Sequence, residues 1–221
     1  MARVAFLGGT GPEGLGLALR FAQAGEDIII GSRQRERAAR AAETLRSRLT
    51  SSSVRRVDGF ENPVAAREAD IVALTPPFEG LEAMLIEIAP ALAGKIVLDV
   101  VNPLHLGGGI FTLLPVPAGS AAELTQKLVP EAQVVSGFKN LSAKELWELE
   151  GPLHGDVLLC SDVPQATRYF VELIRRIPEL RPIDAGRLAN ARRLESITAL
   201  LLNLNRRYRA ITSIQILGLK I

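Results

Sequence analysis

The stretch Arg3-Val4-Ala5-Phe6-Leu7-Gly8-Gly9-Thr10-Gly11-Pro12-Glu13-Gly14 decides the fold of this chain. Its first five residues form a short apolar run typical of a β-strand, and residues 15–24 then carry apolar side chains at helical spacing. Three glycines, Gly9, Gly11 and Gly14, lie between the strand and the helix. They permit a tight turn, close approach of a pyrophosphate to the backbone and close helix–strand packing. The stretch therefore predicts the start of a dinucleotide-binding fold.

The rest of the chain continues the alternation of strands and helices. Apolar runs at 28–30, 71–75, 96–101 and 134–138 have no polar face, which suits parallel strands covered by helices on both sides. Segments with helical composition or spacing lie between them. We therefore predict an α/β fold with a Rossmann-type, doubly wound, mostly parallel sheet. A small C-terminal α/β extension follows it and ends in a long helix at 187–208.

Some local signals refine this picture. Residues 102–119 are rich in glycine and proline, and we expect a long loop there, at an edge where open α/β sheets bind ligands. Asn62 is expected to cap a helix at 63–68, and Ser120 and Glu123 have the spacing of a capping box. We assign residues 1–150 to a nucleotide-binding domain. Residues 151–221 are expected to form a smaller domain that takes part in dimerisation.

The charge balance and the few metal-binding side chains exclude several classes of function. The 221 residues include 26 basic and 24 acidic side chains, so the net charge of +2 gives no reason to expect nucleic acid or a membrane surface as a partner. The sequence has one cysteine, Cys160, and two histidines, His105 and His154, so we predict no metal site. A single cysteine favours a reducing, cytoplasmic setting.

The residues after the second strand indicate which dinucleotide binds. NAD-binding folds usually have an acidic residue there, which holds the ribose 2′-hydroxyl. This chain has Ser32 and Arg33 instead, with Arg37 beyond. Arg33 and Arg37 would share a helix face if the helix begins by residue 33. A hydroxyl and a guanidinium bind a 2′-phosphate, so the sequence predicts NADP(H) rather than NAD(H).

Three stretches resemble the NADPH-dependent F420 reductases, also called F420H2:NADP oxidoreductases. They are residues 6–11, residues 31–33 and the run from Asp184 to Ser196, which also resembles the cytoplasmic domain of STEAP-type ferric reductases. The resemblance covers nearly the whole chain. It implies that a hydride passes directly between the nicotinamide of NADP and the deazaflavin F420, with the two rings stacked. It also implies that the smaller domain, residues 151–221, helps to cover the deazaflavin as the second cofactor or substrate.

The resemblance also implies roles for particular residues. Four positions match pyrophosphate contacts: Thr10, Gly11, Pro12 and Glu13. Three match contacts to the 2′-phosphate: Ser32, Arg33 and Arg37. The nicotinamide half would be lined by Pro76, Asn102, Leu104 and Ala143, and the residues that match the deazaflavin side are Arg192, Ser196 and Thr198. Prolines also end strands for purely structural reasons, which would account for Pro76 without a ligand.

One position departs from the family pattern. Archaeal members have a histidine near the deazaflavin, where this chain has Lys139. An ammonium group there would stabilise negative charge on the reduced deazaflavin; otherwise Lys139 is a solvated lysine at a strand end. Arg192 would hold an anionic tail of the substrate. The hydroxyls of Ser196 and Thr198 either contact the ligand or bond back to the helix backbone.

Three hypotheses about function follow. The first is hydride transfer between NADP(H) and F420. The second, motivated by Lys139, is an NADPH-dependent reductase of another acceptor, such as a flavin, a ferric chelate or an imine. The third is a non-catalytic NADP-binding sensor with a partner surface at the apolar tail, residues 214–219. This tail and the apolar face at 197–204 exceed what a small C-terminal domain covers, so we also expect a homodimer.

Overall fold

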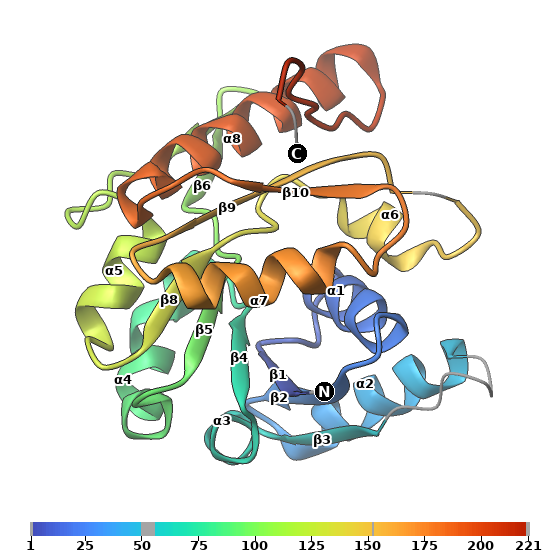
Figure 1. Ribbon diagram of the computed structural model, residues 1–221, viewed down its shortest axis with the longest axis vertical. Coiled ribbons are helices and arrows are strands. Elements are labelled where there is room, and N and C mark those ends of the chain that lie inside the picture. Colours follow the sequence, from blue (N-terminus) through green and yellow to red (C-terminus); the bar gives the residue numbers. More distant parts are fainter. Residues whose placement is uncertain (1, 50–55, 152, 220–221) are drawn as a thin grey trace.

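A computed structural model, which describes residues 2–49, 56–151 and 153–219, contains one eight-stranded sheet. The strand order is β10-β9-β8-β5-β4-β1-β2-β3, and neighbouring strands are parallel except β8 and β9 (Figure 1). The strands are β1 (Arg3–Leu7), β2 (Asp27–Ser32), β3 (Val57–Glu61), β4 (Ile71–Leu74), β5 (Ile96–Asp99), β8 (Gln133–Ser136), β9 (Gly155–Ser161) and β10 (Leu180–Asp184). The predicted fold class is confirmed.

Helices cover both faces of the sheet because its central strands are apolar on both faces. In β1, Val4 and Phe6 pack into one core, whereas Ala5 and Leu7 pack into the other. The first core is covered by α1 (Pro12–Gln23), α2 (Arg35–Arg48), α6 (Ala143–Trp147) and α7 (Pro164–Ile174). The second is covered by α3 (Asn62–Glu68), α4 (Leu81–Leu92) and α5 (Ala121–Leu128).

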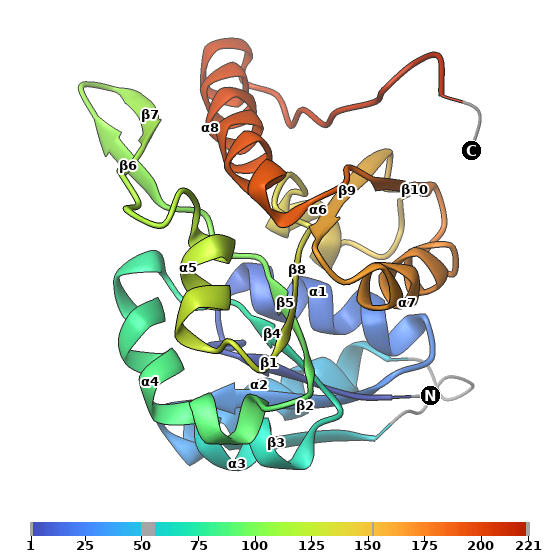
Figure 2. The same cartoon turned by 60° about the vertical axis from the view of Figure 1, so that its left-hand side comes forward.

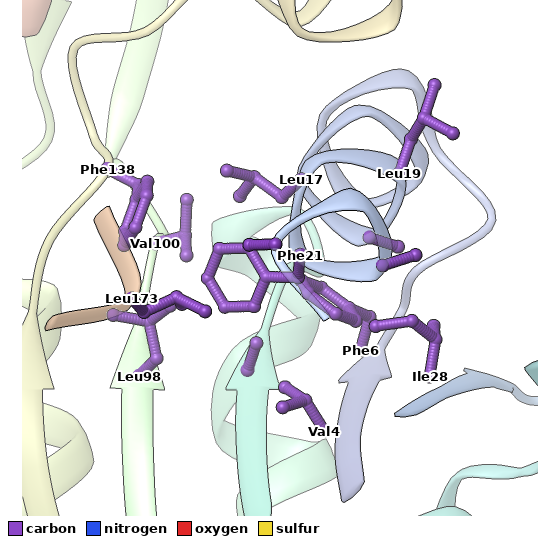
Figure 3. Close-up of a cluster of buried hydrophobic side chains, with 14 of the residues drawn as sticks. Val4, Phe6, Leu17, Leu19, Phe21, Ile28, Leu98, Val100, Phe138 and Leu173 are labelled. Carbon is purple, nitrogen blue, oxygen red and sulfur yellow. The ribbon is translucent and has the colours of Figure 1, made fainter. Parts of the chain in front are cut away.

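An aromatic cluster ties the C-terminal part of the chain to the first helix. The ring of Phe21 in α1 lies 5.3 Å from Phe6 in β1 and 5.3 Å from Phe138, which follows β8 (Figure 3). Phe170 of α7 completes the cluster, 6.3 Å from Phe138. Each such pair contributes about 0.5–1.5 kcal/mol beyond the burial of its surface. The cluster therefore holds the end of β8 in a fixed place.

The predicted loop at 102–119 contains a β-hairpin, which corrects the sequence-based expectation. Strands β6 (Leu104–Gly107) and β7 (Ile110–Leu113) are joined by Gly108 and Gly109, whose φ angles of +57° and +84° fit the two central residues of a type I′ turn. Asn203 in the last long helix, α8 (Ala191–Tyr208), bonds to both the N–H and the C=O of Phe111. The hairpin and α8 therefore project together from the sheet (Figure 2).

Helix starts agree with the sequence in one case and differ in two. Ser120 caps α5 by accepting a hydrogen bond from the Glu123 amide at 3.1 Å, as predicted. Asn62 does not cap α3; it lies inside the helix, and its Oδ1 accepts a 3.4 Å hydrogen bond from the amide of Gly8. The long helix begins at Ala191 rather than 187, after a 3-10 turn, η3 (Leu188–Asn190). Of the helices in the described ranges, none is both long and apolar enough to span a membrane.

Candidate cofactor and substrate site

The glycine turn after β1 has one crowded side and one open side. The amide of Gly9 donates to the carbonyl oxygens of Phe6 and Gly31, both at 3.2 Å, which closes the turn. A Cβ atom on Gly14 would lie 2.6 Å from the Cα of Gly9, so this glycine permits α1 to pack on the turn. A Cβ atom on Gly11 would meet no atom of the described residues within 4 Å. The open side therefore suits the approach of a ligand to the backbone.

The N-terminus of α1 opens from the same turn and suits an anion. Gly11 is the N-cap residue, and no side chain among the described residues caps the helix there. The first amides of α1 are thus available to a phosphate, aided by the positive end of the helix dipole. Burial raises the pKa of Glu13, in the first turn, to about 8. Its carboxyl group is therefore largely protonated at neutral pH and does not repel an anion.

The carboxyl end of β2 presents basic side chains beside this turn. Ser32 is buried, and its Oγ accepts a 3.3 Å hydrogen bond from the amide of Gln34, whereas Arg33 and Arg37 are exposed. Arg33 and Arg37 do not share a helix face, because α2 begins at Arg35 and the condition that it begin by residue 33 is not met. The two guanidinium groups are nevertheless on the segment that leads from β2 into α2. A 2′-phosphate would be bound by a loop residue and a helix residue together.

The residues expected along the nicotinamide half lie on neighbouring elements. Pro76 follows β4, and a Cβ atom on Gly8 would lie 2.9 Å from its Cα, so Pro76 abuts the glycine turn. Asn102 follows β5, the next strand of the sheet, and Leu104 begins β6. Ala143 begins α6, which packs on Gly16 of α1. The carboxyl ends of β1, β4 and β5 form the sheet edge at which the strand order reverses, where open α/β folds bind ligands.

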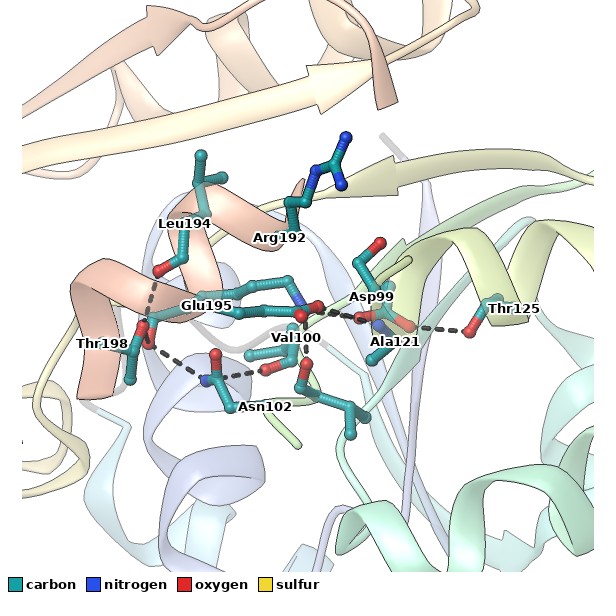
Figure 4. Close-up of polar contacts among 12 residues, drawn as sticks. Asp99, Val100, Asn102, Ala121, Thr125, Arg192, Leu194, Glu195 and Thr198 are labelled. Atoms are coloured by element: carbon teal, nitrogen blue, oxygen red, sulfur yellow. Dashed lines mark hydrogen bonds and ion pairs between the residues drawn. The ribbon is translucent and has the colours of Figure 1, made fainter. Parts of the chain in front are cut away.

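A buried ionic network lies just below this edge and joins three elements (Figure 4). The ammonium of Lys139 lies 2.7 Å from Asp99 Oδ1 of β5 and 3.4 Å from Glu195 Oε1 of α8, and it also donates to the carbonyl of Val101. The three charged side chains are at most 1% exposed. Thr125 donates to the other oxygen of Asp99 at 2.7 Å. Lys139 is therefore not the solvated lysine of the second expectation, because its ammonium group is buried and paired with protein oxygens. Its effect on charge at the deazaflavin stays a prediction.

Glu195 is the titratable member of this network near neutral pH. Burial raises the pKa of its carboxyl group to about 7, even though Lys139 and the amide of Ala121 lower it. The Ala121 amide, which begins α5, donates to Oε1 at 3.0 Å. Glu195 thereby links α5, α8 and the end of β8. Sequence reasoning missed both Glu195 and Asp99. The sequence did contain a signal for Asp99. A carboxylate at the end of an otherwise apolar strand is buried, and a buried carboxylate requires a partner.

An open hollow of about 780 Å³ lies between the hairpin's exit and the start of α8. Its lining residues are Leu113, Leu114, Pro115, Val116, Gly119, Arg192, Arg193 and Ser196. The structure thus brings Arg192 and Ser196 together, and Arg192 points away from the buried network (Figure 4). Thr198 is different. It is buried and its hydroxyl lies 3.0 Å from the carbonyls of Leu194 and Lys139, so the alternative that it bonds back to the helix backbone is confirmed. Its contact with a ligand stays a prediction.

Comparison with known proteins places the chain in a family. The model for "NADP oxidoreductase coenzyme F420-dependent" matches residues 3–103. The F420-dependent NADP reductase of Methanocaldococcus jannaschii is 38% identical over 223 residues, which cover 99% of this chain and 100% of the relative. That of Methanothermobacter marburgensis is 40% identical over 207 residues, 92% of each chain. The chain belongs to the F420-dependent NADP oxidoreductase family.

The fold of this family member also matches a solved structure along its whole length. A crystal structure from Arthrobacter sp. FB24 superposes with a TM-score of 0.82 and 24% identity, covering 99% of this chain and 100% of that one. At that identity the match concerns the fold alone. It includes the C-terminal extension as well as the dinucleotide-binding strands. The family's open α/β architecture is therefore present in this chain from β1 to α8.

Proposed function

We propose that this family member transfers a hydride between NADP(H) and coenzyme F420. The observation that carries the proposal is 38–40% identity, over at least 92% of the chain, to reductases named for these two cofactors. The glycine turn and the arginine-lined hollow supply two places for ligands. Glu195 connects them, because it lies on α8 between Arg192 and Ser196 while its carboxylate reaches the sheet edge.

The protein's part in the reaction is to bind and orient the two ligands. Gly9, Gly11 and Gly14 shape the turn, and Thr10, Pro12 and the first amides of α1 would hold the pyrophosphate. The nicotinamide and the deazaflavin themselves supply the hydride chemistry. Pro76, Asn102, Leu104 and Ala143 line the nicotinamide half and keep water from the contact between the rings. A direct transfer needs no general acid or base from the protein, so correct orientation is the main contribution.

The hollow beside α8 is the place for the second ligand. The side chains of Arg192 and Arg193 both line it, which concentrates positive charge at its wall. Guanidinium groups bind phosphate and carboxylate groups well, so the hollow suits a ligand with an anionic tail. Ser196 contributes a polar wall, although its hydroxyl also donates to the carbonyl of Arg192 at 2.8 Å.

The choice of NADP(H) over NAD(H) rests on Ser32, Arg33 and Arg37. The double variant Arg33→Glu/Arg37→Glu should weaken binding of NADPH by at least tenfold and leave binding of NADH nearly unchanged. The matched control is Arg35→Glu/Arg40→Glu, which makes the same change in charge at two other exposed arginines of α2. Equal losses for both nucleotides, or in both double variants, would contradict a specific 2′-phosphate site.

The proposal also includes a homodimer formed through the projecting hairpin and α8. Leu106 and Ile110 of the hairpin and Leu200 of α8 are large apolar side chains exposed by 48%, 56% and 57%. Apolar groups on two joined, projecting elements favour a protein partner. Light scattering should give twice the mass of one chain at micromolar concentration, and the double variant Leu106→Ser/Leu200→Ser should give the mass of one. A monomeric mass for the unaltered protein would refute the dimer.

A cytoplasmic location completes the proposal. The thiol of Cys160 is buried, and burial raises its pKa to about 12, so it stays protonated. A chain with one such cysteine has no disulfide of its own to form. Recovery of the protein with the cytoplasmic fraction of lysed cells is the expected result, and recovery with a secreted or membrane fraction would contradict it.

A further inference from the structure

Asn102 carries a buried acceptor for which the described part of the chain offers no donor. Its Oδ1 atom is buried and has no hydrogen-bond partner among the described residues. The Nδ2 atom of the same amide faces two carbonyl oxygens, that of Lys139 at 3.2 Å and that of Val100 at 3.5 Å. Of the two ends of the Asn102 amide, only the NH2 group can donate to a carbonyl oxygen. These two contacts therefore assign Nδ2 and Oδ1. A buried acceptor without a donor is costly unless a ligand supplies one.

The carbonyl of Lys139 is held in place from two sides. On one side, the ammonium group of the same residue is anchored by Asp99, Glu195 and the carbonyl of Val101. On the other, the hydroxyl of Thr198 lies 3.0 Å from the Lys139 carbonyl oxygen. The preceding residue, Phe138, has a φ of +58°, a conformation that non-glycine residues seldom adopt, and its ring is fixed in the aromatic cluster. This backbone is therefore rigid.

We propose that Lys139 is a positioning residue: it holds the Asn102 amide so that Oδ1 accepts a hydrogen bond from the carboxamide N–H of the nicotinamide. The ammonium itself touches no ligand. It fixes the backbone of residue 139, and the carbonyl of that residue orients Asn102. The inference rests on the proposed function only in placing the nicotinamide at this edge of the sheet.

A nucleotide analogue that lacks the carboxamide N–H tests the proposed hydrogen bond to Asn102 Oδ1. A purely structural role of Lys139 would not change the preference for NADP⁺ over this analogue. The acetylpyridine analogue of NADP⁺ has a methyl ketone in place of the carboxamide and so has no N–H to donate. The protein should bind NADP⁺ about tenfold more tightly than this analogue, a typical effect of leaving a buried acceptor without its donor. The ratio of the two dissociation constants therefore measures the contact with Asn102 directly.

Three variants test whether Lys139 acts through Asn102. Asn102→Ala removes the acceptor, Lys139→Met removes the anchor, and the double variant removes both. Each single variant should lower the ratio from about tenfold to near one, and the double variant should lower it no further, because the two residues act through one contact. Protein fluorescence during titration with each nucleotide gives the dissociation constants without any acceptor substrate.

Lys139→Met leaves two buried carboxylates without their cation and can unfold for that reason. A second variant is therefore designed to remain folded. Lys139→Met/Asp99→Asn, studied at pH 6, removes the ammonium together with one negative charge while Glu195 is mostly protonated. Thr125→Val is the matched control. It removes the hydrogen bond to Asp99 Oδ2 and should lower the melting temperature, but it leaves the Lys139 carbonyl and the binding ratio unchanged.

The outcomes separate this inference from the proposed function. The positioning role is supported if the ratio of the two dissociation constants falls to near one in Asn102→Ala and in either Lys139 variant. In Thr125→Val the ratio should stay near tenfold. A ratio that stays near tenfold in a folded Lys139 variant overturns it, as does independent, multiplicative loss in the double variant or a ratio near one in the unaltered protein. Failure of the protein to exchange a hydride with F420 would refute the proposed acceptor, while these binding ratios would still test Lys139.

Discussion

Replacing Glu195 with glutamine should remove a large pH dependence of folding stability. The Glu195 side chain is 1% exposed, and burial raises its pKa from 4.5 to about 7. Between these values the folded protein retains a proton that the unfolded chain has released. Rising pH therefore favours unfolding across this range, and the destabilisation is complete above pH 7. Glutamine keeps an oxygen that accepts from the Ala121 amide but has no proton to lose.

The size of the effect follows from the shift. Each pH unit in the window changes the free energy of unfolding by about 1.4 kcal/mol for one proton. From pH 5 to pH 8 the contribution of Glu195 thus falls by about 2–3 kcal/mol, because the slope is smaller close to each of the two pKa values. The stability of Glu195→Gln relative to the unaltered protein should rise by this amount between pH 5 and pH 8.

Urea unfolding of both proteins at pH 5, 6, 7 and 8, followed by circular dichroism, measures the difference. Glu87→Gln, at an exposed position of α4, serves as the control, and its stability should run parallel to that of the unaltered protein. If the curve for Glu195→Gln is also parallel, Glu195 does not titrate between pH 5 and 8, and the description of its burial is wrong.

Three further predictions concern other contacts. Gly14→Ala should cost about 1–3 kcal/mol of stability and weaken NADPH binding, measured by urea unfolding and titration, because its Cβ would lie 2.6 Å from the Gly9 Cα; unchanged affinity would refute the packing role. Asn203→Ala should increase hydrogen exchange at Phe111 while global stability changes by less than about 2 kcal/mol, since it removes two hydrogen bonds at the hairpin. Burial alone would raise the pKa of Asp156, but Arg181 and the Ile216 amide lower it overall. Arg181→Met should therefore destabilise the protein at pH 7, and the loss should shrink as the pH falls below 3.8 and through the lowered pKa of Asp156. A pH-independent loss in urea unfolding would contradict this.

The buried strands of the sheet and the helices that cover them could be predicted from the pattern of apolar residues in the sequence. Runs such as Ile28-Ile29-Ile30 are apolar on both faces, and the structure buries them between two layers of helices. The glycine turn was also predictable, because Gly9 and Gly14 each lie where a Cβ atom would clash, while Gly11 leaves the outer side of the turn open. The hairpin was not recognised, although Gly108-Gly109 permits a type I′ turn. Its strands are short, and neither is buried on a full face.

The environment of Lys139 shows why the site was harder to predict. A lysine after a buried strand is usually solvated, and its burial here depends on two carboxylates, Asp99 and Glu195, that are 40 residues before it and 56 after it in the chain. No local pattern contains all three. Thr198 has the same difficulty, since its partner is the carbonyl of Lys139 from another element. Contacts between distant segments therefore decide where the side chains of Lys139 and Thr198 lie.

The most direct test of the central claim is to mix the purified protein with NADPH and F420 and follow the visible absorbance band of F420. Our account predicts that the band disappears at a rate proportional to protein concentration, that NADH replaces NADPH poorly, and that excess NADP⁺ restores the band from reduced F420. A stable band in the presence of protein that binds NADPH tightly would contradict the proposed hydride transfer to F420.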